Sequence, residues 1–280
     1  MLKNILVCID GSASSEETTL TAIKIARERN ASLVGMVLVH EPDSRAGAHT
    51  NIDGSSFVHR WSRWRHVDVQ AYAAMLLATF QRRCMAAGVP VRVLEVVDRS
   101  PEDIIAEIDL HDLTLIGHED QAESKSDRRA TREKILRHTS RPVLLIPDDT
   151  TGMSDPLGPT VLIAYDGGQA AERALASFAA SGLGQSRDVH VATIGDDGEK
   201  AMETAMQAAD RLRAAGIEAT AHSIVSALPD SEALVELETK LGAGLVVMGA
   251  FARSRIKELF SGSLTRALVA GSLTPVYLQH

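Results

Sequence analysis

The sequence is poor in cysteine and in aromatic residues. It holds two cysteines among 280 residues, Cys8 and Cys84, and aromatic side chains make up 4% of it. Two cysteines make no disulfide framework, so we expect reduced, buried thiols in a cytoplasmic protein. No apolar run reaches the roughly 20 residues that a membrane-spanning helix needs, and no membrane span is expected. The chain passes from Met1 straight into a strand-like run, so we expect no signal peptide.

A surplus of positive charge is also absent. The 29 Lys and Arg residues are outnumbered by 37 Asp and Glu residues, which gives a formal net charge of −8 at pH 7. Nucleic-acid binding depends on Lys and Arg that neutralise phosphates, so we expect no nucleic-acid partner. The patterns G-x-x-x-x-G-K-[ST], G-x-G-x-x-G and G-x-S-x-G do not occur. We therefore expect no dedicated catalysis, with slow ATP hydrolysis as an open alternative.

One pattern is present twice along the chain. The runs "KNILVCIDGS" at residues 3–12 and "PTVLIAYDGG" at residues 159–168 both end in Asp followed by Gly, at Asp10 and Asp166. In each copy an amphipathic helix, four further strands and their connecting helices follow in the same order. Continuously apolar strands that alternate with helices are typical of parallel sheets covered on both faces. Each copy therefore predicts a doubly wound α/β domain with a five-stranded parallel sheet.

Composition places the joint between the two copies. Residues 147–160 are rich in Pro, Gly, Asp and Thr, as turns and linkers are. We expect a first domain at 1–148, a linker at 149–159 and a second domain at 160–280. The number of residues between a position in the first copy and its equivalent in the second is 156 at the first strand but only 132 at the end of the fourth strand. The first domain therefore carries an insertion of about two dozen residues, which the segment at about 41–68 accommodates.

The loop after the fourth strand of the second copy has the features of an anion site. Gly249 begins this loop, Gly262 and Ser263 open the last helix, and Arg253 lies between them. Ligands in open α/β sheets settle beyond the carboxyl ends of the strands, and free amides at a helix N-terminus attract phosphate. The alternative is a plain strand-to-helix connection, whose glycines make turns and whose serine caps the helix.

The first copy carries acidic residues where the second has small ones. Asp120 stands in the place of Ala252, and Glu119 and Glu123 lie nearby. Two like charges ~4 Å apart repel by about 4 kcal/mol at an effective dielectric constant near 20. A triphosphate would meet several such repulsions, so we expect the first copy to be degenerate and to bind no ATP. Asp10 then serves as a turn residue or as a cap for the following helix.

The segments "ILVCIDGS", "VLIAYDGG", "LVVMGAFA…SGSLT" and "TPVYL" resemble the universal stress protein family in its tandem, two-domain form. The resemblance implies two adenine-nucleotide α-hydrolase-like domains related by a pseudo-twofold axis, with their fifth strands paired. Nucleotide-binding members carry G-x2-G-x9-G-[ST] after the fourth strand, and Ala252 replaces the second glycine here. An alanine in left-handed geometry costs roughly 1–2 kcal/mol, which weakens such a site without abolishing it.

By this resemblance the second domain binds ATP or a related adenine nucleotide, accompanied by Mg2+. Asp166 would face the ribose or the metal-linked phosphates, and Ile194 would lie beside the adenine. The output would be regulatory, with nucleotide occupancy changing a surface that an unknown protein partner reads, and the chain would form a homodimer. No catalytic residue and no metal-ligating side chain is expected. The implied nucleotide-binding residues are Ala164, Asp166, Ile194, Met248, Gly249, Ala252, Arg253, Gly262, Ser263, Leu264 and Thr265.

The insertion supplies the main alternative function. It contains a compact basic and aromatic cluster of Arg60, Trp61, Arg63, Trp64, Arg65 and His66. Such a cluster could bind an acidic partner or a small ligand, which would make the protein an interaction module without nucleotide. The spacing also fits the packed face of a long helix running to Met85, and we favour this structural interpretation. A metal site that includes His40 and His118 is a minor alternative, because no histidine pair has zinc-site spacing.

Overall fold

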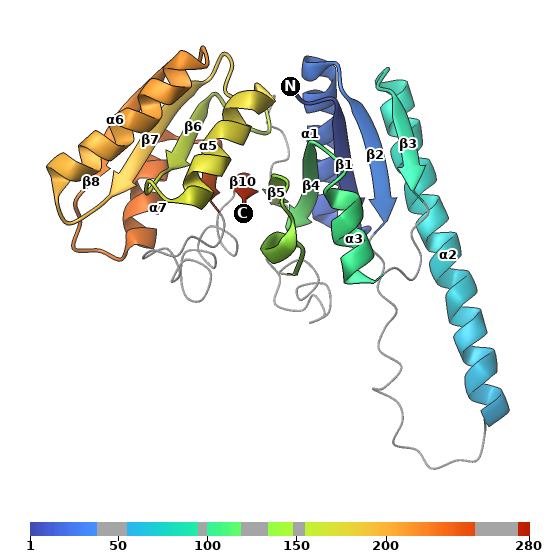
Figure 1. Ribbon diagram of the computed structural model, residues 1–280. Coiled ribbons are helices and arrows are strands. Elements are labelled where there is room, and N and C mark those ends of the chain that lie inside the picture. The colour runs from blue at the N-terminus through green and yellow to red at the C-terminus, as the bar shows by residue number, and fades with distance from the viewer. Residues whose placement is uncertain (38–54, 95–99, 119–133, 148–154, 250–273) are drawn as a thin grey trace.

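The computed structural model describes residues 1–37, 55–94, 100–118, 134–147, 155–249 and 274–280, with only the backbone given for residues 13, 55–69, 101 and 118 (Figure 1). The elements of the first half are β1 (Asn4–Ile9), α1 (Ala13–Arg29), β2 (Ser32–Val37), α2 (Ser55–Ala86), β3 (Val91–Leu94), α3 (Pro101–Ile108), β4 (Leu113–His118) and β5 (Val143–Pro147). Those of the second half are β6 (Thr160–Ala164), α5 (Gln169–Ser181), β7 (Asp188–Ile194), α6 (Gly198–Ala214), β8 (Ala219–Ile224), α7 (Asp230–Leu241), β9 (Leu245–Gly249) and β10 (Val276–Gln279).

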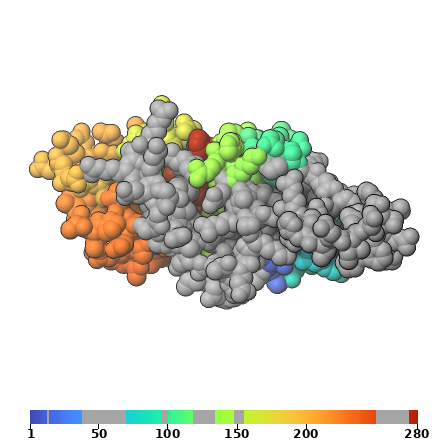
Figure 2. Space-filling view, turned by 90° about the horizontal axis from the view of Figure 1, so that it is seen from below, coloured from blue at the N-terminus to red at the C-terminus, as the bar shows by residue number. Residues whose placement is uncertain are grey.

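The strands form one sheet of ten, in the order β3-β2-β1-β4-β5-β10-β9-β6-β7-β8. All pairs within each half are parallel, whereas β5 and β10 pair antiparallel, with Tyr277 opposite Leu144. Seen from below, the red atoms of the C-terminal end lie between the yellow atoms of the second half and the green atoms of the first (Figure 2). The two predicted five-stranded parallel sheets are confirmed, and so is the pairing of their fifth strands.

Helices cover both faces of this sheet. One core cluster joins the sheet to α1, α2, α5 and α6, and it includes Ile25, Phe178 and Tyr277. The other cluster lies on the opposite face, where Ile108 of α3 and Leu234 of α7 pack. Both clusters contain residues of β5 and of β10, so each core runs without a break from one half to the other. The hydrophobic interior is therefore shared between the two halves.

Tyr277 of β10 anchors this shared interior. Its side chain is fully buried, and its ring meets Phe178 of α5 edge to face at a centroid distance of 5.9 Å. Its hydroxyl donates a hydrogen bond to Ser177 Oγ over 3.0 Å, which gives the buried polar atom a partner. Burial raises the pKa of Tyr277 well above its ordinary value, so the hydroxyl stays protonated at neutral pH.

Two further expectations are met by the described residues. Cys8 and Cys84 are both buried and form no disulfide, and burial raises the pKa of the Cys84 thiol to about 11. The helix expected to run to Met85 is α2, and its first turns project beyond the sheet (Figure 1). The side chains of the Trp and Arg cluster on α2 lie outside the described residues. No helix in the described part of the chain is long and apolar enough to cross a membrane.

Polar contacts also join the two halves on the α1 side. Asp155, just before β6, contacts Lys24 of α1 at 3.1 Å and Arg187 at 2.9 Å. Arg29 at the end of α1 donates a hydrogen bond to Gln185 over 2.8 Å. Burial alone would raise the pKa of Asp155, but the hydrogen bond from Lys24 and the charge of Arg187 outweigh it and lower that pKa. The Asp155 carboxylate is therefore stabilised in its charged form.

Replacing Asp155 with asparagine tests this contact through its pH dependence. A carboxyl with a lowered pKa stabilises the fold above its unfolded pKa of about 3.9 and loses that contribution as the pH falls further. We expect Asp155→Asn to unfold at lower urea concentration than the wild type at pH 7, and the difference to shrink below about pH 4. Asp210→Asn, which breaks an exposed pair with Arg213, is the control and should change the midpoint little. A difference at pH 7 that persists unchanged at pH 3 would contradict this assignment.

Candidate functional site

The carboxyl ends of β6, β7 and β9 bring three of the predicted residues together. Ala164 at the end of β6 pairs in register with Met248 of β9 and with Ala192 of β7. Met248 is buried, whereas Ala164 and Ile194 are half-buried and pack against the same core cluster on the α7 face. These side chains form an apolar patch at the carboxyl ends of the strands, where ligands of open α/β sheets bind.

Asp166 lies two residues after the end of β6, in a tight turn that occurs in both halves. Its Oδ1 accepts a hydrogen bond from the Gly168 amide over 2.8 Å, and Gly167 between them has φ +75°. Asp10 accepts from the Ser12 amide over 3.0 Å in the same way, across Gly11 at φ +76°. Glycine adopts positive φ without steric cost, which explains the repeated Asp-Gly pair. Each aspartate therefore shapes the entry into the first helix of its half.

In the first half, hydroxyl groups fill the start of α1. The Ser12 hydroxyl donates to Asp10 Oδ1 over 2.5 Å and accepts from the Ser15 amide over 3.3 Å. It also lies 2.9 Å from Ser14 Oγ, and Ser15 Oγ accepts from the Asp10 amide over 3.3 Å. Of the amides that a helix leaves unpaired at its N-terminus, this set satisfies that of Ser15. In the first half the Asp10 carboxylate and the start of α1 are therefore already engaged by hydroxyl groups of the protein itself.

In the second half the same backbone carries no such cap. Gly168 has φ −76° and Ser12 has φ −77°, but α5 receives no hydrogen bond from the side chain of its N-cap position. A Cβ built at Gly167 would meet only Thr204 Cγ2, at 3.6 Å, within 4 Å among the described residues. The start of α5 thus lacks the hydroxyl groups that close the start of α1, and it lies directly after Asp166.

Gly249 is required by packing at the end of β9. A Cβ built there would lie 2.5 Å from both Ala170 C and Ala171 N, at the start of α5. Gly117 in the first half is equally close to α1, where its Cβ would lie 2.5 Å from Ser14 Oγ and 3.1 Å from Ser14 C. Because the glycine is present in both halves, it serves the packing of the first helix on the fourth strand whether or not a ligand binds.

A hydrogen-bonded group links this end of β6 to α6. Tyr165, between Ala164 and Asp166, donates from its hydroxyl to Glu172 of α5, and Arg211 of α6 contacts both side chains. Burial, followed by the hydrogen bond to Glu172, raises the pKa of Tyr165 to about 12. The Tyr165 carbonyl in turn accepts from Thr193 Oγ1 over 2.8 Å. The turn at Asp166 is therefore tied through side chains to the outer helices.

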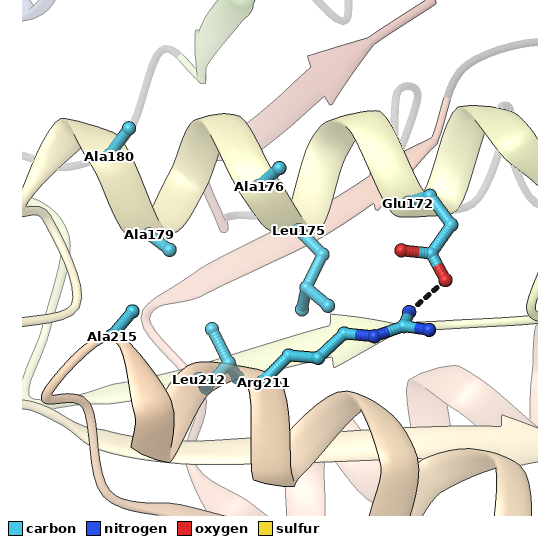
Figure 3. A pocket seen from close by; sticks show the side chains of 8 residues that line it. All are labelled: Glu172, Leu175, Ala176, Ala179, Ala180, Arg211, Leu212 and Ala215. Atoms are coloured by element: carbon cyan, nitrogen blue, oxygen red, sulfur yellow. Dashed lines mark hydrogen bonds and ion pairs between the residues drawn. The ribbon is translucent and has the colours of Figure 1, made fainter.

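Glu172 and Arg211 close one end of a groove between α5 and α6 (Figure 3). The groove has a volume of about 390 Å³, and Leu175 and Leu212 line it together with alanine methyl groups. The first half repeats the ion pair as Glu16 with Arg83 at 2.7 Å, so this link between the first two helices belongs to the repeated fold. Sequence reasoning missed it, although the alignment of the copies carries the signal: both members recur at equivalent positions.

The predicted phosphate loop lies outside the described residues. This applies to six members of the expected set: Ala252, Arg253, Gly262, Ser263, Leu264 and Thr265. It applies equally to the acidic loop around Asp120 in the first half and to His40. The contrast between the two loops therefore stays a prediction from sequence. Where the structure describes the chain, no group of three or more His, Cys, Asp or Glu side chains could hold a metal ion.

Comparison with known proteins gives a consistent result for both halves. The model of the universal stress protein family matches residues 1–147 and 159–279. The curated universal stress protein Slr1230 of Synechocystis sp. is 24% identical over an alignment of 297 positions. This alignment covers 98% of this chain and 99% of that protein. The crystal structure of a universal stress protein from Archaeoglobus fulgidus has a TM-score of 0.71 at 18% identity, covering 99% of this chain and 95% of its own. A putative universal stress protein from Pseudomonas aeruginosa has a TM-score of 0.54 at 17% identity, with coverages of 99% and 93%.

A single methyl group at Gly249 tests the packing role described above. The nearest atoms to the new Cβ would be backbone atoms of α5, which cannot turn away, so Gly249→Ala should lower the free energy of unfolding by about 1–3 kcal/mol. Gly195→Ala is the matched control, because its Cβ would meet nothing closer than 3.5 Å and its φ is not positive. Urea denaturation compares the two variants. Equal midpoints for both would show that α5 does not press on β9 as described.

Proposed function

The chain belongs to the universal stress protein family, and from this premise we propose that its second half binds ATP or a related adenine nucleotide as a regulatory module. In this proposal the first half binds no nucleotide and serves as the structural partner of the second. The proposal places the protein in the cytoplasm, in keeping with its two buried free thiols. It assigns no catalytic step to either half.

The contrast between the starts of α1 and α5 carries the proposal. The two helices begin with the same turn and nearly identical backbone angles, yet only α1 is capped by the side chain of its N-cap residue. The Ser12 hydroxyl donates to Asp10 and accepts from the Ser15 amide, whereas Gly168 has no hydroxyl that could engage Asp166 in this way. The half that lacks this cap is also the half whose predicted loop keeps Gly262 and Ser263 and lacks the carboxylates of the first copy.

The described residues suit an adenine nucleotide at this position. Ala164 and Ile194, which pack with the buried Met248, offer an apolar surface for the base, and Asp166 supplies a carboxylate that can accept hydrogen bonds from ribose hydroxyls. The phosphates would then extend toward the predicted loop and the amides around Ser263. Mg2+ usually binds through one or two carboxylates together with substrate phosphates, and Asp166 is the carboxylate at this strand end.

The output proposed for the site is a change at the protein surface. Tyr165 is adjacent to Asp166 in the chain, and its hydroxyl lies in the group formed with Glu172 and Arg211. A movement of the turn on nucleotide binding would therefore change the α5–α6 groove, and a protein partner could recognise that change. The same proposal includes homodimerisation through outer surfaces, because the fifth strands of the two halves are already paired with each other.

Exchanging the cap between the two halves tests the proposal. Gly168→Ser should place a hydroxyl group where Ser12 has one and let it donate to Asp166 as Ser12 donates to Asp10. Because that carboxylate is the proposed ribose acceptor, we expect ATP binding to weaken at least about tenfold, which corresponds to about 1.4 kcal/mol. Ser12→Gly opens the start of α1 and should leave the affinity unchanged. Stability should change by only a few tenths of a kcal/mol in Ser12→Gly, because serine and glycine are similar N-cap residues. A Cβ at position 168 would lie 2.9 Å from Asp166 Oδ1, so Gly168→Ser also requires a small shift of that side chain. Isothermal titration calorimetry with ATP, with and without Mg2+, measures the affinities.

The same titrations separate the alternatives. Equal and weak binding by the wild type, Gly168→Ser and Gly262→Asp would favour the interaction module that uses the basic and aromatic cluster of the insertion. Product analysis after incubation with ATP and Mg2+ would reveal turnover if the protein were an ATPase. Loss of binding in Ser12→Gly but not in Gly168→Ser would place the nucleotide in the first half and contradict the proposal.

A further inference from the structure

Two histidines on neighbouring strands of the second half form a pair away from the nucleotide-binding end. His190 lies near the start of β7 and His222 lies on the edge strand β8. His190 Nδ1 is 2.8 Å from His222 Nε2, and the rings are tilted by 42°. His190 Nε2 lies 3.1 Å from Asp188 Oδ2. The three side chains thus form a continuous row from the carboxylate through one imidazole to the other.

Asp188 determines which nitrogen of His190 carries the proton. A carboxylate accepts hydrogen bonds, so a neutral His190 that donates from Nε2 to Asp188 presents the lone pair of its Nδ1 to His222. His222 must then donate from Nε2 to complete the pair. If the His222 proton moves to its own Nδ1, two nitrogen lone pairs face one another. A carboxylate behind a histidine, with the free nitrogen of the ring directed at a shared point, is the arrangement that surrounds metal-bound histidines.

The fold itself does not require this pair. At the equivalent positions of the first half the residues are Val34 of β2 and Leu94 of β3, in the same strand register. Val34 is buried and Leu94 is partly buried, and both belong to the core cluster on the α3 and α7 face. An apolar pair is thus sufficient to hold the second and third strands together in this architecture. In the second half, two imidazole rings take the places of these aliphatic side chains.

We propose that His190 and His222 bind a divalent transition-metal ion such as Zn2+, Ni2+ or Cu2+, with Asp188 as the second-shell partner of His190. Imidazole nitrogen is a preferred ligand for these ions. Zinc–nitrogen bonds of about 2.0–2.1 Å in tetrahedral geometry place two ligand nitrogens roughly 3.3 Å apart. The rings would need to separate by about half an ångström from their present contact, which a small rotation of His222 supplies. The pair provides two ligands, and water completes the shell from the half-buried side of His222.

The charges around the pair set its affinity. Asp188 favours a bound cation, whereas Lys240 of α7 acts on His222 with the opposite sign. Two protein ligands hold an ion less tightly than the three or four of established zinc sites. We therefore expect a site that responds to changes in metal availability.

Titration of the full chain with Zn2+ and Ni2+ tests the site. We expect the wild type to bind one more ion than His222→Leu and His190→Val, which restore the residues of the first half, and to show a metal-dependent rise in Tm that both variants lose. Asp188→Asn should weaken affinity about tenfold or more while keeping both ligands, as loss of a second-shell partner does. Lys240→Gln should strengthen binding. His138→Gln removes an exposed histidine elsewhere and should behave as the wild type does.

The experiment distinguishes this site from metal binding by other histidines. If His222→Leu binds as many ions as the wild type with the same affinity, or if His138→Gln loses as much as His222→Leu, the proposal is wrong. If His222→Leu fails to fold without metal, His222→Gln, which keeps a polar side chain, takes its place as the test variant. Imidazole 15N chemical shifts of His190 and His222 must both move on addition of Zn2+, and shifts confined to other histidines would overturn the assignment.

Discussion

The antiparallel pairing of β5 with β10 is the contact on which the rest of the molecule depends. Each half alone would expose its fifth strand, a mostly apolar row with unpaired backbone groups, at the edge of its sheet. Joining the two rows satisfies those groups and lets the cores on both faces continue through Leu144, Leu145 and Tyr277. The first helix of each half packs against one strand of this pairing, α1 against β5 and α5 against β10.

The internal repeat allows each half to serve as a reference for the other. Where the halves agree, as in the Asp-Gly turns, the glycines at the ends of β4 and β9, and the Glu–Arg pairs between helices, the fold explains the residue. Where they differ on the same backbone, the fold is satisfied by either residue and another cause is needed. Ser12 against Gly168 and Val34 against His190 are the differences on which the two proposals rest.

Much of the architecture could be predicted from the sequence because the repeat doubles the signal. Two copies of the same alternation of apolar strands and helices fixed the strand types, and the helix up to Met85 was found from its aromatic spacing. Tertiary contacts were harder to foresee. The sequence suggested a ligand role for Gly249, which stays a prediction, and the structure adds a packing reason for the glycine because α5 leaves no room for a side chain there. The group of Tyr165, Glu172 and Arg211 brings together three separate elements, which local patterns cannot reveal.

A single polypeptide that contains both members of a sheet pairing behaves differently from two chains that must meet. The tether between β5 and β6 keeps the two fifth strands at a high effective concentration, so their association does not depend on how much protein is present. Dilution that would dissociate a pair of separate subunits leaves this one intact. One member of the pair is then free to diverge without losing its scaffold, because its partner is always made with it.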